Sequence, residues 1–155
     1  MKKLFSILLV ACCAALFAGC ATGPAYSVYK SSIPPLAQDQ GRIFFYRNAG
    51  LGAALVPDIK LNGQVIGSSQ TGTFFYIDRP AGDYQVETTT EVRRTLSLTL
   101  DKNQTRFVRF DVSMGFFVGH VYPVLVENAD AEAEIENCTY WEPQRQTQAS
   151  TDYSH

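Results

Sequence analysis

Residues 95–100 read Thr-Leu-Ser-Leu-Thr-Leu, the cleanest alternation of polar and apolar residues in the chain. A strict period of two over this length predicts a β-strand that buries one face, here the three leucines. Working outward, residues 106–112 and residues 84–88 alternate in the same way, and polar turn residues 101–104 lie between two of these segments. The middle of the chain is therefore predicted to consist of β-strands joined by short turns.

Two aromatic segments precede this region. Residues 42–47 read Arg-Ile-Phe-Phe-Tyr-Arg and are apolar on both faces, which predicts a central strand. Residues 73–78 contain the run Phe-Phe-Tyr and predict another strand. We interpret both aromatic triplets as core, because alternation buries one or two members of each. The alternative interpretation is a platform on which sugar rings or a peptide stack.

The turns between these segments have specific signatures. Asn62-Gly63 is the strongest hairpin signal, because both central residues of a type I′ turn need positive φ. It joins a strand at residues 55–61, which Pro57 forces to an edge or a bulge, to an antiparallel strand at residues 64–68. Residues 79–83 form a second turn around a Pro-Ala-Gly sequence.

The apolar segment 116–127 contains Gly119 and Pro123 and predicts two short strands or one strand with a bulge. Asn128 or Asp130 is expected to cap a short helix that continues through residue 137. The fold class is therefore all-β, an antiparallel β-sandwich of about seven or eight short strands, Ig-like or prealbumin-like, with one short C-terminal helix.

The N-terminus has the parts of an export signal. Lys2 and Lys3 precede an apolar run, which is shorter than a membrane-spanning helix and ends at Leu16-Phe17-Ala18-Gly19-Cys20. That pattern resembles a bacterial lipobox and makes Cys20 the lipid-modified first residue of the mature chain. A competing match at Leu9-Val10-Ala11-Cys12 would leave a very short apolar core.

These features divide the chain into a lipoprotein signal peptide (1–19), a Pro- and Ser-rich tether (20–40), the sandwich (41–141) and a polar, disordered tail (142–155). Tyr26, Val28 and Tyr29 could dock on the sandwich or belong to the tether. Ala21 follows the lipidated cysteine, and by resemblance to known sorting patterns this indicates a fatty-acylated, palmitate-bearing lipoprotein of the outer membrane that faces the periplasm.

Composition excludes several classes of function. Removing Lys2 and Lys3 from 13 basic residues leaves 11 against 15 acidic ones, a net charge of about −4 that disfavours nucleic-acid binding. Once Cys20 carries lipid, Cys138 is the one remaining thiol, so neither a disulfide nor a cysteine zinc site can form. We interpret Cys138 as a packed core residue and expect no cofactor.

Four motifs in order resemble a known family: Gly41 to Arg47, then Leu61-Asn62-Gly63, then Pro80-Ala81-Gly82-Asp83-Tyr84, then Phe107-Val108-Arg109. The family comprises small bacterial envelope lipoproteins and is catalogued as a domain of unknown function. The resemblance covers about residues 41–137 and departs from the family pattern at Ala81, which separates the usual Pro-Gly pair. It implies a lipid-anchored β-sandwich and no catalytic residues.

Catalytic chemistry has little support in the sequence. His120 is the one histidine inside the sandwich, and a metal site needs three or four ligands. No nucleophile-elbow or zinc-protease motif occurs. We therefore expect a non-catalytic interaction or structural module that meets another envelope protein or peptidoglycan. The alternative is a glycan-binding protein or hydrolase that acts on envelope polysaccharide or peptidoglycan.

The predicted partner contact is the segment around Phe116, Phe117, His120 and Tyr122. Its glycines loosen the backbone, and alternation sends at least one of the two phenylalanines away from the core. Recognition at this segment would need a sheet edge or an apolar loop.

Overall fold

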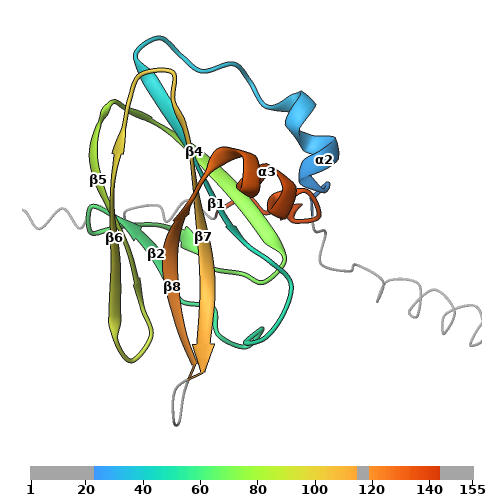
Figure 1. Ribbon diagram of the computed structural model, residues 1–155, viewed down its shortest axis with the longest axis vertical. Helices are drawn as coiled ribbons and strands as arrows, with labels where there is room; N and C mark the ends of the chain where they lie inside the picture. The colour runs from blue at the N-terminus through green and yellow to red at the C-terminus, as the bar shows by residue number, and fades with distance from the viewer. Residues whose placement is uncertain (1–22, 115–118, 144–155) are drawn as a thin grey trace, which may run out of the picture.

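The computed structural model describes residues 23–114 and 119–143. In this part of the chain two β-sheets pack face to face, and two helices lie on one side of them (Figure 1). The five-stranded sheet has the order β8 (Gly119–Val126), β7 (Thr105–Met114), β1 (Gln40–Arg47), β4 (Thr73–Pro80) and β9 (Thr139–Tyr140). The four-stranded sheet has the order β3 (Gln64–Ser68), β2 (Asp58–Leu61), β5 (Gly82–Thr89) and β6 (Arg93–Leu100). The predicted all-β sandwich is confirmed.

Strand β1 occupies the centre of the five-stranded sheet, as its apolar faces predict. It pairs antiparallel with β4 but parallel with β7, and β9 is also parallel to β4. The predicted antiparallel pairing holds for five of the seven strand pairs in the described part of the chain, and the two parallel pairs make the five-stranded sheet mixed. The physical reason is that the chain crosses to the other sheet at Ala81, between β4 and β5, and returns only with β7.

The Asn62-Gly63 turn has the predicted conformation, with φ of 49° at Asn62 and 82° at Gly63. The side-chain oxygen of Asn62 also accepts a 2.8 Å hydrogen bond from the backbone N–H of Gln85. The preceding strand begins at Asp58 and not at residue 55, because Pro57 lies outside the ladder. The irregularity that Pro57 predicted begins two residues later, between Ile59 and Lys60.

Two apolar clusters lie on the two faces of β1. Ile43 and Phe45 point into the space between the sheets, where they join residues from both of them. Phe44 and Tyr46 point to the opposite face, where they pack beneath the helices. All four side chains are buried, so the interpretation of the first aromatic triplet as core is confirmed.

Within the segment expected to be a tether over residues 20–40, residues 23–34 are folded onto the domain. Helix α2 (Tyr26–Tyr29) and the 3-10 turn η2 (Lys30–Ser32) cover the outer face of the five-stranded sheet. Tyr26 is buried and Tyr29 stacks on Tyr140 with ring centroids 4.2 Å apart, whereas Val28 remains exposed. The aromatic side chains therefore convert a Pro- and Ser-rich stretch into part of the fold.

Strand β8 pairs with β7 in continuous register, so segment 119–126 is one strand without a bulge. Pro123 is tolerated because β8 is an edge strand. Helix α3 (Asn128–Ile135) follows, and its N-cap is Glu127, with no side-chain capping bond. The expected caps Asn128 and Asp130 lie instead inside the first turn, and the helix ends at Ile135, two residues earlier than expected.

Candidate functional site

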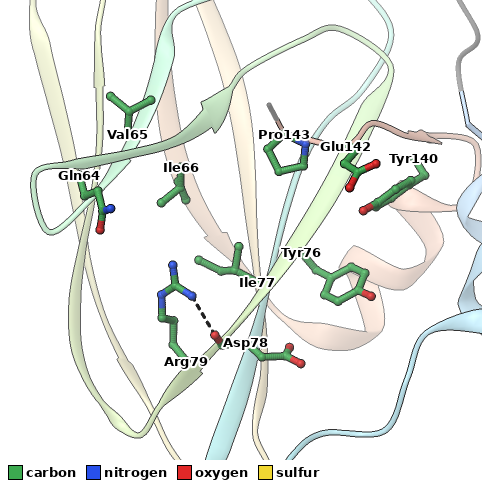
Figure 2. A pocket seen from close by; sticks show the side chains of 10 residues that line it. All are labelled: Gln64, Val65, Ile66, Tyr76, Ile77, Asp78, Arg79, Tyr140, Glu142 and Pro143. Atoms are coloured by element: carbon green, nitrogen blue, oxygen red, sulfur yellow. Dashed lines mark hydrogen bonds between the residues drawn. The ribbon is translucent and has the colours of Figure 1, made fainter. Parts of the chain in front are cut away.

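A groove lies between the free edges of the two sheets. Strand β9 covers only Thr73 and Phe74 of β4 and is bridged on its other side by Ala25, so the rest of β4 extends past it toward β3, the edge of the other sheet. The cavity there measures 510 Å³. Figure 2 shows β3 side chains along one wall, β4 side chains along the other, and the chain after β9 at one end; the lining residues are Gln64, Val65, Ile66, Tyr76, Ile77, Asp78, Arg79, Tyr140, Glu142 and Pro143.

The charges in this groove, which we call the edge groove, are fixed by Arg42. Its guanidinium donates to both carboxylate oxygens of Asp78 at 2.7 and 2.8 Å and lies 4.6 Å from the ring centre of Tyr76. The hydrogen bond to Asp78 raises the pKa of Arg42 above its ordinary value. Asp78 is therefore held by a two-pronged ion pair with Arg42, which gives it a structural role in the wall of the groove. Glu142 supplies a second, exposed carboxylate.

A second feature is an accumulation of exposed apolar side chains at one end of the sandwich. The connection 48–57, the turn 90–92 and the end of β7 lie at the same end (Figure 1). These segments carry most of the large exposed apolar residues in the described part of the chain, and we call them the apolar end: Leu51, Val56, Val92 and Met114. Leu51 and Met114 are the most exposed of these, at 78% and 77%.

Arg47 shapes the apolar end from within. Its guanidinium donates hydrogen bonds of 2.5–3.2 Å to four backbone oxygens, those of Leu51, Gly52, Leu55 and Ser69. The residue is only 2% exposed, and this burial lowers the pKa of its guanidinium. Because all four acceptors belong to connections between strands, Arg47 fixes the shape of the loop that presents Leu51 and Val56.

The sequence did not single out Arg47, although it contained a signal. In an alternating strand, residue 47 shares a face with Ile43 and Phe45. The charged side chain of Arg47 is therefore expected on the face that points into the core. A buried cation needs several hydrogen-bond acceptors, because without them the end of the strand would not stay folded.

The predicted contact segment borders the apolar end. Phe116 and Phe117 lie outside the described residues. His120 and Tyr122 lie on β8 and are half-buried, and His120 Nδ1 is 3.4 Å from Thr90 Oγ1 on the β5–β6 turn. Tyr122 lies beside Arg94 and Thr95, in a separate hollow over β6. His120 and Tyr122 are two residues apart on β8 and share one face of that strand, and His120 lies nearer the apolar end, beside Thr90.

A charged network also lies beneath α3, and the sequence did not indicate it. Arg109 donates to Asp111 at 2.6 and 2.9 Å and to Glu134 at 2.7 and 2.8 Å. The hydroxyl of Tyr46 donates to Glu134 at 2.7 Å. Burial and the hydrogen bond to Glu134 raise the pKa of Tyr46. These contacts hold α3 against the five-stranded sheet and explain a helix that buries only Ala131 and Ile135.

Cys138 is buried, and its thiol lies 3.6 Å from the backbone oxygen of Arg47 and from Asn48 Oδ1. Burial raises the pKa of the thiol to about 11. This confirms the interpretation of Cys138 as a packed core residue.

Within the described ranges, no group of three or more His, Cys, Asp or Glu side chains is arranged to hold a metal ion. None of the helices in the same part of the chain has the length and apolar character needed to cross a membrane.

Comparisons of the sequence with known proteins identify a family, but the proteins they match have no described activity. The model of a family described as a protein of unknown function, DUF2846, matches residues 37–121. An uncharacterized protein of Haemophilus influenzae is 30% identical over 125 residues, which cover 77% of this chain and 74% of that protein. No solved structure matches the chain.

Proposed function

The chain belongs to the DUF2846 family of proteins of unknown function, and from this premise we propose that it is a lipid-anchored envelope lipoprotein acting as a non-catalytic interaction module. The lipid is attached to Cys20, and the domain faces the periplasm from the outer membrane. Its partner is another envelope protein that binds the apolar end.

The observation that carries the proposal is the exposure of Leu51, Val56, Val92 and Met114 at one end of the sandwich. Exposed apolar side chains on segments that share one end of the domain offer an apolar contact to a partner. Arg47 holds the loop that carries Leu51 and Val56 in one shape, which lowers the entropy lost on binding. A non-catalytic role is supported by the ion pair that occupies Asp78 and by the burial of Cys138.

In-cell photo-crosslinking tests the partner contact. A photo-reactive amino acid at Leu51 or Met114 should capture one envelope protein, and the same amino acid at Ser97, an exposed residue on the outer face of β6, should not. Met114→Ser should keep its melting temperature and weaken the crosslink formed from Leu51. Equal capture from Ser97 and Met114 would refute the apolar end as the contact.

Metabolic fatty-acid labelling tests the anchor. Label should be present on the wild type and absent from Cys20→Ala. Label that persists on Cys20→Ala and disappears only when Cys12 is replaced would move the cleavage site to the earlier match.

A second candidate function is glycan binding in the edge groove. It is favoured by two tyrosines, Tyr76 and Tyr140, and two carboxylates in a cavity large enough for a sugar ring. Calorimetry with soluble peptidoglycan fragments tests it: binding should weaken in Gln64→Ala, which changes only the wall formed by β3. No heat at millimolar fragment would exclude this candidate.

A further inference from the structure

The chain is fixed to the domain from Gly23 onward. The N–H of Gly23 donates to the backbone oxygen of Tyr140 at 3.0 Å, and the N–H of Tyr140 donates to the oxygen of Pro24 at 2.8 Å. A Cβ at residue 23 would lie 2.5 Å from that same Tyr140 oxygen, so only glycine permits the close approach. The described chain therefore begins at a point already held by two backbone hydrogen bonds.

The residues after Gly23 strengthen this attachment. Tyr26 donates its backbone N–H to Cys138 at 2.8 Å, and its ring meets Phe44 and Phe74 edge-on at 5.7 and 5.3 Å. Arg42 donates to the backbone oxygen of Pro34 at 2.9 Å and closes the other end of the segment. Residues 23–34 are thus held along their length and cannot act as a flexible spacer.

Only Ala21 and Thr22 separate the proposed lipid site at Cys20 from Gly23. Three extended Cα–Cα steps span at most about 10 Å, whereas a flexible tether from residue 20 to residue 40 would span about 25 Å. We infer that the face formed by Pro24, Ser27, Val28, Lys30 and Ser31 lies directly against the phospholipid bilayer that carries the anchor. This inference rests on the proposed lipidation of Cys20.

The chemistry of this face, which we call the anchor face, fits lipid headgroups. Its five residues are exposed, and Val28 is 65% exposed. Lys30 is the one charged residue in segment 23–33, and a cation is favoured near an anionic bilayer surface. Two exposed carboxylates lie beside this segment, that of Glu136, whose backbone oxygen accepts from the N–H of Ser27, and that of Glu132, which acts on Tyr26, and both disfavour burial in the hydrocarbon core.

The contact also orients the rest of the domain. Helices α2 and α3 lie on one side of the sandwich, and β5 and β6 lie on the other (Figure 1). With the anchor face on the bilayer, the outer surface of the four-stranded sheet points away from the membrane.

A matched pair of cysteine variants tests this orientation. Ser27→Cys and Ser97→Cys replace exposed serines on opposite sides of the sandwich, and each is labelled with a fluorophore in the full-length lipidated protein. Labelled wild type shows that buried Cys138 takes no dye. The protein is placed in phosphatidylethanolamine–phosphatidylglycerol vesicles that contain lipids with a headgroup nitroxide.

The two dyes are separated by a helix layer and two sheets, about 20 Å at about 10 Å per layer, so quenching at residue 27 should exceed that at residue 97 at least about threefold. Inserting a ten-residue Gly-Ser linker between Thr22 and Gly23 should remove most of this difference. Equal quenching of the two dyes on protein that carries lipid by mass spectrometry would overturn the inference. Absence of lipid on the protein would instead overturn the proposed anchor, so the two failures are distinguishable.

Discussion

Replacing Arg47 with leucine should destabilise the domain more than any surface change. The substitution removes a donor from four backbone oxygens, in a residue that is 2% exposed. A hydrogen bond from a charged donor is worth about 1.5–3 kcal/mol, but exposed loop carbonyls regain water and the desolvation of the guanidinium is relieved. Counting about half of the four bonds as lost gives about 3–6 kcal/mol, or a melting temperature lower by roughly 12–24 °C at about 4 °C per kcal/mol.

Thermal and urea unfolding of Arg47→Leu, Arg47→Lys and Arg94→Leu measure this effect. Lysine keeps the charge but lacks the planar fork, so Arg47→Lys should lose about half as much. Arg94 is exposed on β6, and its replacement should change stability by no more than about 0.5 kcal/mol. Hydrogen exchange at residues 51–55 should rise in both Arg47 variants. A melting temperature of Arg47→Leu within about 3 °C of wild type would show that the loop needs no such support.

Three further changes follow from other contacts. Gly63→Val should lower the free energy of unfolding by about 1–3 kcal/mol, because φ is 82° at this position and a branched side chain is strained there. The space around Gly63 is open, so a steric clash would not account for the loss. Gly50→Val, also in open space but without positive φ, is the matched control in urea titrations. Burial opposes the ionisation of Glu134, but hydrogen bonds from Tyr46 and Arg109 outweigh it and lower the pKa of Glu134 below its ordinary value of 4.5. The unfolded state then binds more protons, so stability should fall as the pH drops below about 4.5, and Glu134→Gln should flatten this dependence in unfolding curves from pH 7 to pH 3. Alkylation of Cys138 should be roughly 100-fold slower in the native protein than in urea, because its pKa is raised to about 11; comparable rates would contradict its burial.

The parts of the fold that could be predicted depend on neighbours in the sequence. The Asn62-Gly63 turn is decided by two residues that tolerate positive φ, and the strand at residues 95–100 by its period of two. The parallel pairing of β1 with β7 joins segments about 60 residues apart and depends on where the chain crosses between sheets. The alternation of polar and apolar residues does not indicate where the chain crosses from one sheet to the other.

The docked N-terminal segment shows the same limit at a candidate site. Pro24, Ser27 and Ser31 give the composition of a linker, and local reasoning predicts one. What folds the segment is Tyr26 against Phe44 and Phe74, which are distant in sequence. The apolar end was likewise only partly predictable, because exposure of Leu51 and Met114 depends on which loops share one end of the sandwich.

Strand β1 connects the two proposed surfaces, and this has a consequence for how they are tested. Phe44 and Tyr46 form the floor on which Tyr26 packs, and Arg47, at the end of the same strand, holds the loop of Leu51. A substitution inside β1 would therefore disturb the anchor face and the apolar end together and could not assign a phenotype to either. Ser27 and Met114 are exposed and lie outside the core clusters, so variants at these positions change one surface at a time. If Met114→Ser weakens partner capture while quenching at residue 27 is unchanged, membrane contact and partner contact are independent properties of the two surfaces.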